Sequence, residues 1–193
     1  KKKVLILGVT GQDGSLLAEL LVKKNILVYG LLRKSSNRNY ANLDKVKNKK
    51  NFKIVNGDML DMFSIERNIK EIKPNEIYNF ADQDHVGWSY EIPSYSFKIT
   101  ALSVIEILEI LKKSKKKIKY FQPISSNIFG ITNTTKQNEN TILTPNSIYA
   151  LAKTTAYNAC KMYNRIYDLF LCGAIYYNHE SPKRNKDYVT KKL

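Results

Sequence analysis

The residues whose types and spacing best fit a catalytic role are Tyr149 and Lys153, which lie four positions apart. In a helix this spacing places both side chains on one face. An ammonium beside a phenol stabilises the phenolate and lowers the tyrosine pKa, so the tyrosine can remove a hydroxyl proton while a hydride leaves the same carbon. Taken alone the pattern is weak, because the chain has 13 tyrosines and many lysines.

The stretch before this pair strengthens the interpretation. Residues 119–123 are typical of a strand, and Ser125, Ser126 and Asn127 follow. Ligands of open parallel sheets bind at the carboxyl ends of the strands, where these side chains would emerge. We therefore expect Ser125 to lie near Tyr149.

A second chemical signal is the segment after the first expected strand, which has glycines at positions 8, 11 and 14. A tight turn, close approach of a pyrophosphate and close helix packing each exclude a Cβ at one of them. The helix that follows would offer free N–H groups to phosphates. Glycines in such a pattern can also serve only as turn residues, but the strand before and the helix after favour a dinucleotide site. Its expected cofactor-binding residues are Gly8, Gly11, Gln12, Asp13 and Gly14.

The second expected strand ends in Arg33 and Lys34, where an NAD-selective site normally has an acidic residue. A guanidinium can bind a 2′-phosphate through two hydrogen bonds, so NADP is favoured while NAD stays possible. The alternative is that both cations only face solvent in a loop. After the third strand, Asp58 and Met59 would lie at the adenine edge, although Asp58 could equally be a turn residue.

Alternation of short β-branched runs with amphipathic stretches predicts the elements that position these residues. We expect an α/β fold with a Rossmann-type, doubly wound parallel sheet. The stretch 131–147 should be a loop before a helix that starts near Ser147. The expected strands are 3–8, 27–32, 52–56, 76–79, 119–123 and 170–177; the expected helices are 15–24, 62–72 and a long helix within 93–113.

Composition narrows the class of protein. The chain has 193 residues, 43% hydrophobic, enough for one sizeable core, and its apolar runs are too short to span a membrane. The net charge of +15 is typical of nucleic-acid binders, but the lysines are scattered and lack interleaved aromatics, so we expect no nucleic-acid partner.

Cys160 and Cys172 are expected to be buried reduced thiols, and His85 and His179 lack companion metal ligands. A start directly in a strand favours the cytoplasm.

Several motifs together resemble the GDP-mannose 4,6-dehydratase family of extended short-chain dehydrogenase/reductases. They are residues 10–15 (TGQDGS), 78–81 (YNFA), His85 with 89–93 (SYEIP), Tyr149 with Lys153, and 178–182 (NHESP). The resemblance covers nearly the whole chain.

The resemblance implies an NADP-dependent reaction on a GDP-sugar. The C4 position is oxidised with Tyr149 as base, water leaves from C6, and the hydride returns there, giving a 4-keto-6-deoxy sugar. Ser125 would hydrogen-bond the C4 oxygen, and Lys153 would hold the cofactor ribose. The substrate-binding residues implied are Ser126, His85, Ser89, Asn178, Arg184 and Val189.

One departure from the family pattern bears on the chemistry. Asn127 stands where the family has a glutamate that assists removal of the C5 proton and loss of the C6 hydroxyl. An amide cannot act as a general acid or base near neutral pH, and loss of such help typically costs about 10² to 10⁴-fold in rate. Asp82 and Asp84 also depart from the small or hydroxylated residues of the family, and we expect them to be solvated loop acids, with a displaced catalytic carboxylate as the alternative.

Two alternative functions remain beside the dehydratase. The first, which Asn127 favours, is a GDP-sugar C4 dehydrogenase or epimerase that eliminates no water. The second is an inactive dinucleotide-binding remnant.

We expect residues 1–193 to form the NAD(P)-binding domain with the start of the substrate region, the C-terminal substrate domain being absent. By resemblance the protein should be a homodimer or homotetramer, with Arg38 near a neighbouring protomer.

Overall fold

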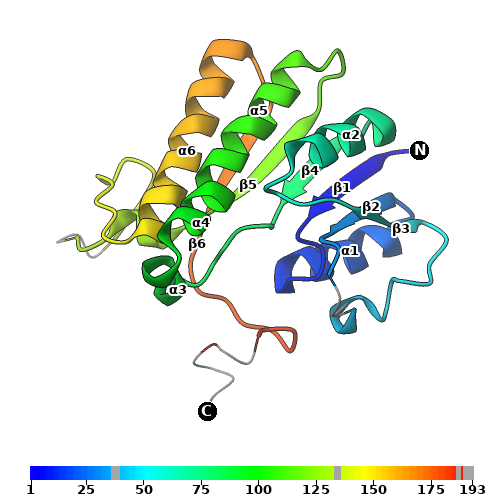
Figure 1. The fold of residues 1–193 in the computed structure, drawn as a ribbon, viewed down its shortest axis with the longest axis horizontal. Helices are drawn as coiled ribbons and strands as arrows, with labels where there is room; N and C mark the ends of the chain where they lie inside the picture. Colours follow the sequence, from blue (N-terminus) through cyan, green and yellow to red (C-terminus); the bar gives the residue numbers. More distant parts are fainter. Residues whose placement is uncertain (36–39, 133–135, 186–187, 189–193) are drawn as a thin grey trace.

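A parallel sheet runs through the computed structural model, which describes residues 1–35, 40–132, 136–185 and 188. In this part of the chain the strand order is β3-β2-β1-β4-β5-β6, and all neighbours are parallel. The predicted doubly wound, Rossmann-type sheet is thereby confirmed (Figure 1). The strands are β1 (Lys3–Leu7), β2 (Leu27–Leu32), β3 (Phe52–Asn56), β4 (Glu76–Asn79), β5 (Lys119–Ser125) and β6 (Leu171–Tyr176).

The winding direction reverses between β1 and β4. From β1 the chain moves outward to β3, then returns to pair β4 with the other side of β1, where Leu7 lies opposite Asn79. The loops that leave β1 and β4 therefore diverge at the carboxyl edge. Open parallel sheets bind ligands at such a switch point.

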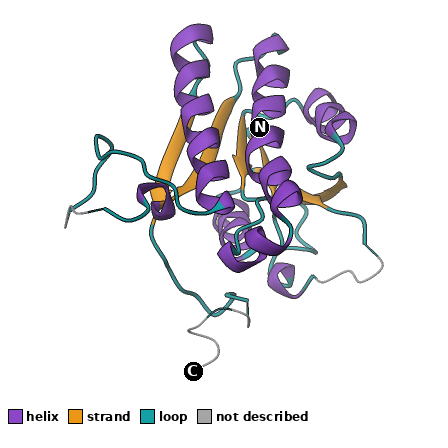
Figure 2. Cartoon of the chain, turned by 60° about the vertical axis from the view of Figure 1, so that its left-hand side comes forward, coloured by secondary structure: helices purple, strands orange, loops and turns teal. Residues whose placement is uncertain are grey.

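The helices cover the sheet unequally. Helices α2, α5 and α6 pack on one face, and α1 packs on the other beneath β1, β2 and β3 (Figure 1). The layer of helices in front of the strands is clear in Figure 2. The α-helices are α1 (Gln12–Lys23), α2 (Met62–Ile72), α3 (Val86–Glu91), α4 (Pro93–Phe97), α5 (Ser103–Lys113) and α6 (Ile148–Tyr167); short helical turns are η1 (Ala41–Leu43), η2 (Lys98–Leu102) and η3 (Ser126–Phe129).

The long helix predicted within 93–113 is present but interrupted. Its middle, η2, is a π-turn between α4 and α5. Two buried hydroxyls stabilise this region: Ser103 Oγ donates to Ile99 O at 2.5 Å, and Thr100 Oγ1 donates to Gln83 O at 3.4 Å. Such single-turn bulges are frequent near functional sites, and this one contacts the loop after β4.

Side chains that point alternately to the two faces of the sheet form two hydrophobic cores. In β1, Leu5 and Leu7 face α2 and α5, whereas Val4 and Ile6 face α1. All four side chains are fully buried. Burial on both sides explains why the central strands read as continuous apolar runs.

Between α1 and the strands β4 to β6 lies a groove of about 680 Å³. Its walls are mainly apolar, and among the described residues no helix covers β4 to β6 on this face of the sheet, the face opposite α5 and α6. The lining includes Leu16, Leu20, Tyr78, Phe121 and Tyr176.

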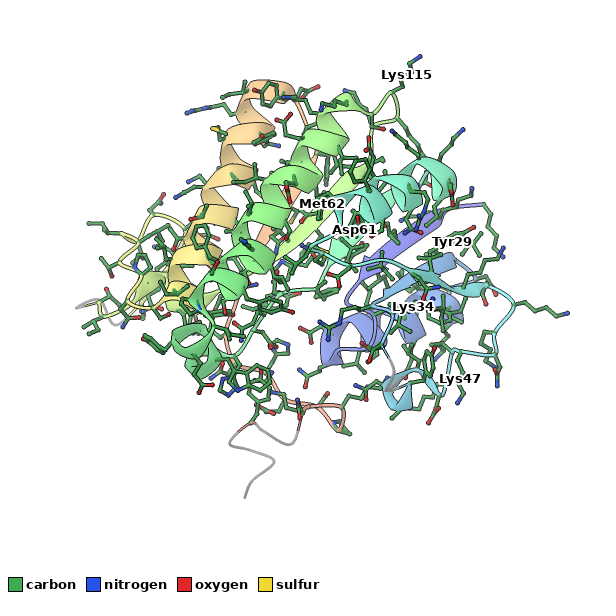
Figure 3. The ribbon with its side chains drawn as sticks, in the orientation of Figure 1. Tyr29, Lys34, Lys47, Asp61, Met62 and Lys115 are labelled. Atoms are coloured by element: carbon green, nitrogen blue, oxygen red, sulfur yellow. The ribbon has the colours of Figure 1, made fainter. Side chains whose placement is uncertain are left out.

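The basic run Lys115 to Lys117 is exposed in the turn before β5, and Lys115 points away from the molecule (Figure 3). The expectation that both cysteines are buried was wrong for one of them. Cys160 packs in the core, but Cys172 on the edge strand β6 is exposed.

None of the described helices has the length and apolarity needed to span a membrane.

Candidate functional site

The turn between β1 and α1 depends on two glycines for steric reasons within the protein. Gly8 has a φ of +73°, and a Cβ there would lie 2.4 Å from Phe80 O. A Cβ on Gly14 would lie 2.4 Å from Gly8 O. Gly8 thus lets β1 approach the end of β4, and Gly14 lets α1 pack against the turn.

Gly11 differs from these two. A Cβ there would meet only Gly8 O, at 3.4 Å, which is an ordinary contact. The added atom would instead project toward the adjoining clefts, which Gly11 lines. Gly11 is also the N-cap of α1 and provides no side-chain cap to its first turn. This arrangement fits a ligand anion that approaches the backbone closely.

A cleft of about 590 Å³ extends from this turn toward the ends of β2 and β3. Arg33 lines it, and its Nη1 donates to the Tyr95 hydroxyl at 3.3 Å. Met59 is buried in its wall. Asp58 also lines the cleft. Its Oδ1 accepts from Leu60 N at 2.9 Å, so the side chain stabilises a turn in addition to facing the cleft.

The second cleft, of about 780 Å³, continues from the same turn toward α6. Helix α6 begins at Ile148 because Ser147 Oγ accepts from Ala150 N at 3.0 Å. This start places Tyr149 and Lys153 in its first two turns, both facing inward. Lys153 Nζ lies 5.9 Å from the centroid of the Tyr149 ring.

Strand β5 extends two residues beyond the predicted end and carries Ser125 to the carboxyl edge. Ser125 Oγ accepts from Asn127 N at 3.2 Å and forms the N-cap of η3. Both residues line the 780 Å³ cleft together with Tyr149. The cleft lining does not include Ser126, so the structure does not bring it to the site with its neighbours.

The expectation that Tyr149 has a lowered pKa was wrong for the free protein. Burial raises the pKa of Tyr149, while the Lys153 ammonium and a hydrogen bond from Ser125 only oppose the shift. The phenol is 7% exposed. Desolvation dominates because the phenolate would lose its water shell.

Asp82 was also misjudged as a solvated acid. Its carboxylate is 5% exposed and forms a buried salt bridge with Lys153, which is 4% exposed. Lys153 Nζ also donates to Pro123 O at 2.8 Å. Burial raises the pKa of Asp82, and the paired ammonium opposes that shift. The sequence feature that could have indicated this buried position is a carboxylate directly after a central strand at the switch point.

The chain after β6 folds back over the start of α1. His179 Nδ1 lies 2.9 Å from Tyr177 O, and Nε2 lies 2.8 Å from Asp13 Oδ1. Gln12 Nε2 donates to His179 O at 3.2 Å. The Arg184 guanidinium stacks on the Tyr188 ring at 3.9 Å, and Arg184 lines the cleft with Asn178.

The remaining expected substrate residues fall in different places. His85 lines the cleft, but its Nδ1 accepts from Trp88 N at 3.2 Å and caps α3. Ser89 is fully buried, and its hydroxyl donates to Val86 O at 2.6 Å. A substrate contact by Ser89 therefore has no support, because α3 turns this face inward. Val189 and Arg38 lie outside the described residues.

Comparison with known proteins adds family information to this geometry. A family model described as GDP-mannose 4,6 dehydratase matches residues 5–193. The chain is 38% identical over 200 residues to a GDP-mannose 4,6-dehydratase of Vibrio cholerae, and 40% identical over 203 residues to GDP-mannose 4,6 dehydratase 2 of Arabidopsis thaliana. Each match covers 100% of this chain and 54% of the relative, so the chain spans about half the length of these relatives.

Solved structures share the fold at low sequence identity. A dTDP-glucose 4,6-dehydratase from Bacillus anthracis in complex with NAD has a TM-score of 0.86 at 22% identity, with 100% of this chain and 60% of that chain covered. A UDP-glucuronic acid 4-epimerase from Bacillus cereus has a TM-score of 0.87 at 19% identity, with 99% and 61% covered. These neighbours have the same overall fold as this chain.

Proposed function

Because the chain belongs to the GDP-mannose 4,6-dehydratase family, we propose that the protein converts GDP-mannose, or a close GDP-sugar, to its 4-keto-6-deoxy product with NADP. The observation that carries the proposal is the cleft that joins the glycine turn to Tyr149, Lys153 and Ser125. In this proposal the start of α1 binds an anion, and the adjacent tyrosine–lysine pair transfers the proton.

The described residues fit a dinucleotide. The start of α1 at Gly11 would receive the pyrophosphate, with Gln12, Asp13 and Gly14 around it. Arg33 would bind a 2′-phosphate, which is the basis for proposing NADP with NAD as the second choice. Asp58 and Met59 would border the adenine. When bound, the nicotinamide would accept a hydride from the sugar C4 and return it to C6.

The chemical work of the chain falls on Tyr149 and its neighbours. Tyr149 would take the proton of the C4 hydroxyl, and Ser125 would hold the C4 oxygen by a hydrogen bond. Lys153 stabilises the phenolate through its charge. His85, Asn178 and Arg184, which line the same cleft, are the residues we propose for substrate contacts.

Asn127 supports a second candidate function. Its exposed amide borders the cleft at the position where the family resemblance places a glutamate. With no general acid or base at that position, oxidation at C4 would proceed while elimination of water would be slow. The alternative is therefore a GDP-sugar C4 dehydrogenase or epimerase.

Mass spectrometry of the sugar product, with parallel measurement of NADPH absorbance, separates these functions. The natural-length protein is incubated with GDP-mannose and NADP⁺. Loss of one water without net NADPH is the result expected of a dehydratase. Loss of two hydrogens with NADPH formation would establish the dehydrogenase instead, and an unchanged mass with conversion to a second isomer would establish the epimerase.

The remaining parts of the proposal concern the whole protein. We propose that residues 1–193 form the NAD(P)-binding domain with the start of the sugar site, and that the rest of that site lies outside this chain. A homodimer or homotetramer in the cytoplasm belongs to the same proposal. Light scattering on the natural-length protein that finds only monomer would contradict the oligomer.

A further inference from the structure

The buried partner of Lys153 is the feature that the proposed reaction leaves unexplained. Asp82 follows β4 and reaches across the carboxyl edge to α6, where its Oδ2 forms the salt bridge with Lys153. Both side chains are at least nine-tenths buried. A buried ion pair costs considerable desolvation, so it persists where its geometry is well supported.

A polar network beneath the cleft holds the Asp82 carboxylate. Gln122 Nε2 donates to Asp82 Oδ2 at 3.4 Å. Gln122 Oε1 in turn accepts from Asn79 Nδ2 at 2.9 Å and from the Tyr120 hydroxyl at 2.5 Å. Gln122, Asn79 and Tyr120 are almost completely buried on two central strands. The carboxylate therefore sits on a rigid support.

This support determines where the ammonium charge lies. Lys153 has three N–H donors, and two of them point to Asp82 and to Pro123 O. Asp82 Oδ1 has no hydrogen-bond partner among the described residues. Lys153 is therefore the only cation that pairs with Asp82 among the described residues, and the two charges offset each other close to Tyr149.

The charged and titratable groups around Tyr149 come from three parts of the chain. Lys153 lies on its own helix, Asp82 and Asp84 lie after β4, and Tyr188 lies near the end of the described chain. Lys153 favours the phenolate, whereas both carboxylates disfavour it. The ammonium is already paired with one of these carboxylates.

We propose that Asp82 is a positioning residue that acts on Tyr149 through Lys153. Its carboxylate holds the ammonium at the floor of the cleft and offsets the ammonium charge, so Tyr149 becomes a phenolate only at more alkaline pH than it would beside an unpaired lysine. The inference rests on the proposed function only in taking Tyr149 as the base.

Direct titration of Tyr149 tests this proposal without cofactor or sugar. The phenolate absorbance of the protein is measured against pH, and the same curve from a Tyr149→Phe variant is subtracted. The pair is then repeated in Asp82→Asn and in Asp82→Ala, the second of which places a small residue where the family tends to have one. Circular dichroism at each pH confirms that the protein is folded.

We expect about tenfold more Tyr149 phenolate at a given pH in both Asp82 variants, which corresponds to a pKa about one unit lower. Asp82→Glu keeps the charge and should restore the original curve. Asp168→Asn is the matched control, because it removes an exposed carboxylate at the far end of the same helix and should change nothing.

Coincident curves for the natural protein and a folded Asp82 variant would overturn the inference. If neither variant folds, a Tyr149 pKa below the ordinary value of 10.0 in the natural protein would overturn the inference, because a buried phenol beside an ammonium whose charge is offset keeps its pKa above that value. Failure of the proposed function looks different: the titration shift persists, but GDP-mannose is not converted.

Discussion

His179 Nε2 lies 2.8 Å from Asp13 Oδ1, which joins the chain after β6 to the first turn of α1. The other ring nitrogen lies 2.9 Å from Tyr177 O. Both nitrogens therefore face acceptors, and only the doubly protonated ring can donate to both. The position of this segment over the cleft should depend on pH.

The first prediction concerns this dependence. The hydrogen bond to Tyr177 O and the Asp13 carboxylate raise the pKa of His179 above 6.5, although burial opposes them. Because the folded pKa is the higher one, the stabilisation is fully present below about pH 6.5 and is lost as pH rises through the folded value. Compared with His179→Gln, the natural protein should gain about 1–3 °C in Tm at about pH 5.5 and little at about pH 8.5.

Thermal unfolding of both proteins across this range measures the effect. Since the ring is 45% exposed, solvent screening keeps it small. A constant Tm difference between the two proteins at all pH values would show that His179 does not titrate with folding.

The second prediction separates two glycines of the same turn. Gly8→Ala should lower the free energy of unfolding by about 2 kcal/mol or more, because the residue has positive φ and its Cβ would collide with Phe80 O. Gly11→Ala should change it by less than about 0.5 kcal/mol and yet weaken NADP binding by about tenfold or more. Urea unfolding and fluorescence titration with NADPH measure the two quantities. Equal losses of stability would show that Gly11 is a turn residue only.

A third prediction addresses the choice of cofactor. Arg33→Ser should weaken NADP⁺ binding by about 10 to 100-fold, since a charge-assisted hydrogen bond pair to the 2′-phosphate is lost, and should leave NAD⁺ binding nearly unchanged. Calorimetric titration with each cofactor gives both affinities. Arg67→Ser on the exposed side of α2 removes the same charge far from the cleft and is the control. Parallel weakening of both cofactors would argue against a 2′-phosphate contact.

The fourth prediction concerns Asn127. Replacing it by glutamate supplies a general acid/base group at the rim of the cleft and should accelerate loss of water from the sugar by about 10² to 10⁴-fold if elimination limits the reaction. Asn127→Gln adds the same length without a titratable group and should not. The exposed side chain makes both changes tolerable for folding. Mass spectrometry of product against time compares them, and equal rates would show that another group already performs this proton transfer.

Much of the fold was predictable from local patterns. The strands β2, β3 and β4 and the helix α2 have the predicted bounds, because apolar periodicity reflects burial directly. The glycines at 8 and 14 were recognisable because backbone geometry excludes a Cβ there. The spacing of Tyr149 and Lys153 also required only that α6 form.

Other features depended on contacts between distant segments. The sequence alone placed Asp82 and Asp84 in one solvated loop, yet Asp82 turns under the cleft to meet a lysine 71 positions away. Ser89 is fully buried because α3 packs against α4 and α6. Cys172 is exposed because β6 lies at the edge of the sheet.

Spacing and backbone preference are local, so the residues that could form a dinucleotide turn and a tyrosine–lysine pair were recognisable from the chain alone. The electrostatics of that pair were not. Burial of Tyr149 and the salt bridge between Lys153 and Asp82 reverse the expected direction of the tyrosine pKa. Desolvation and charge pairing depend on what surrounds a group in the folded protein, and spacing along the chain does not specify those surroundings.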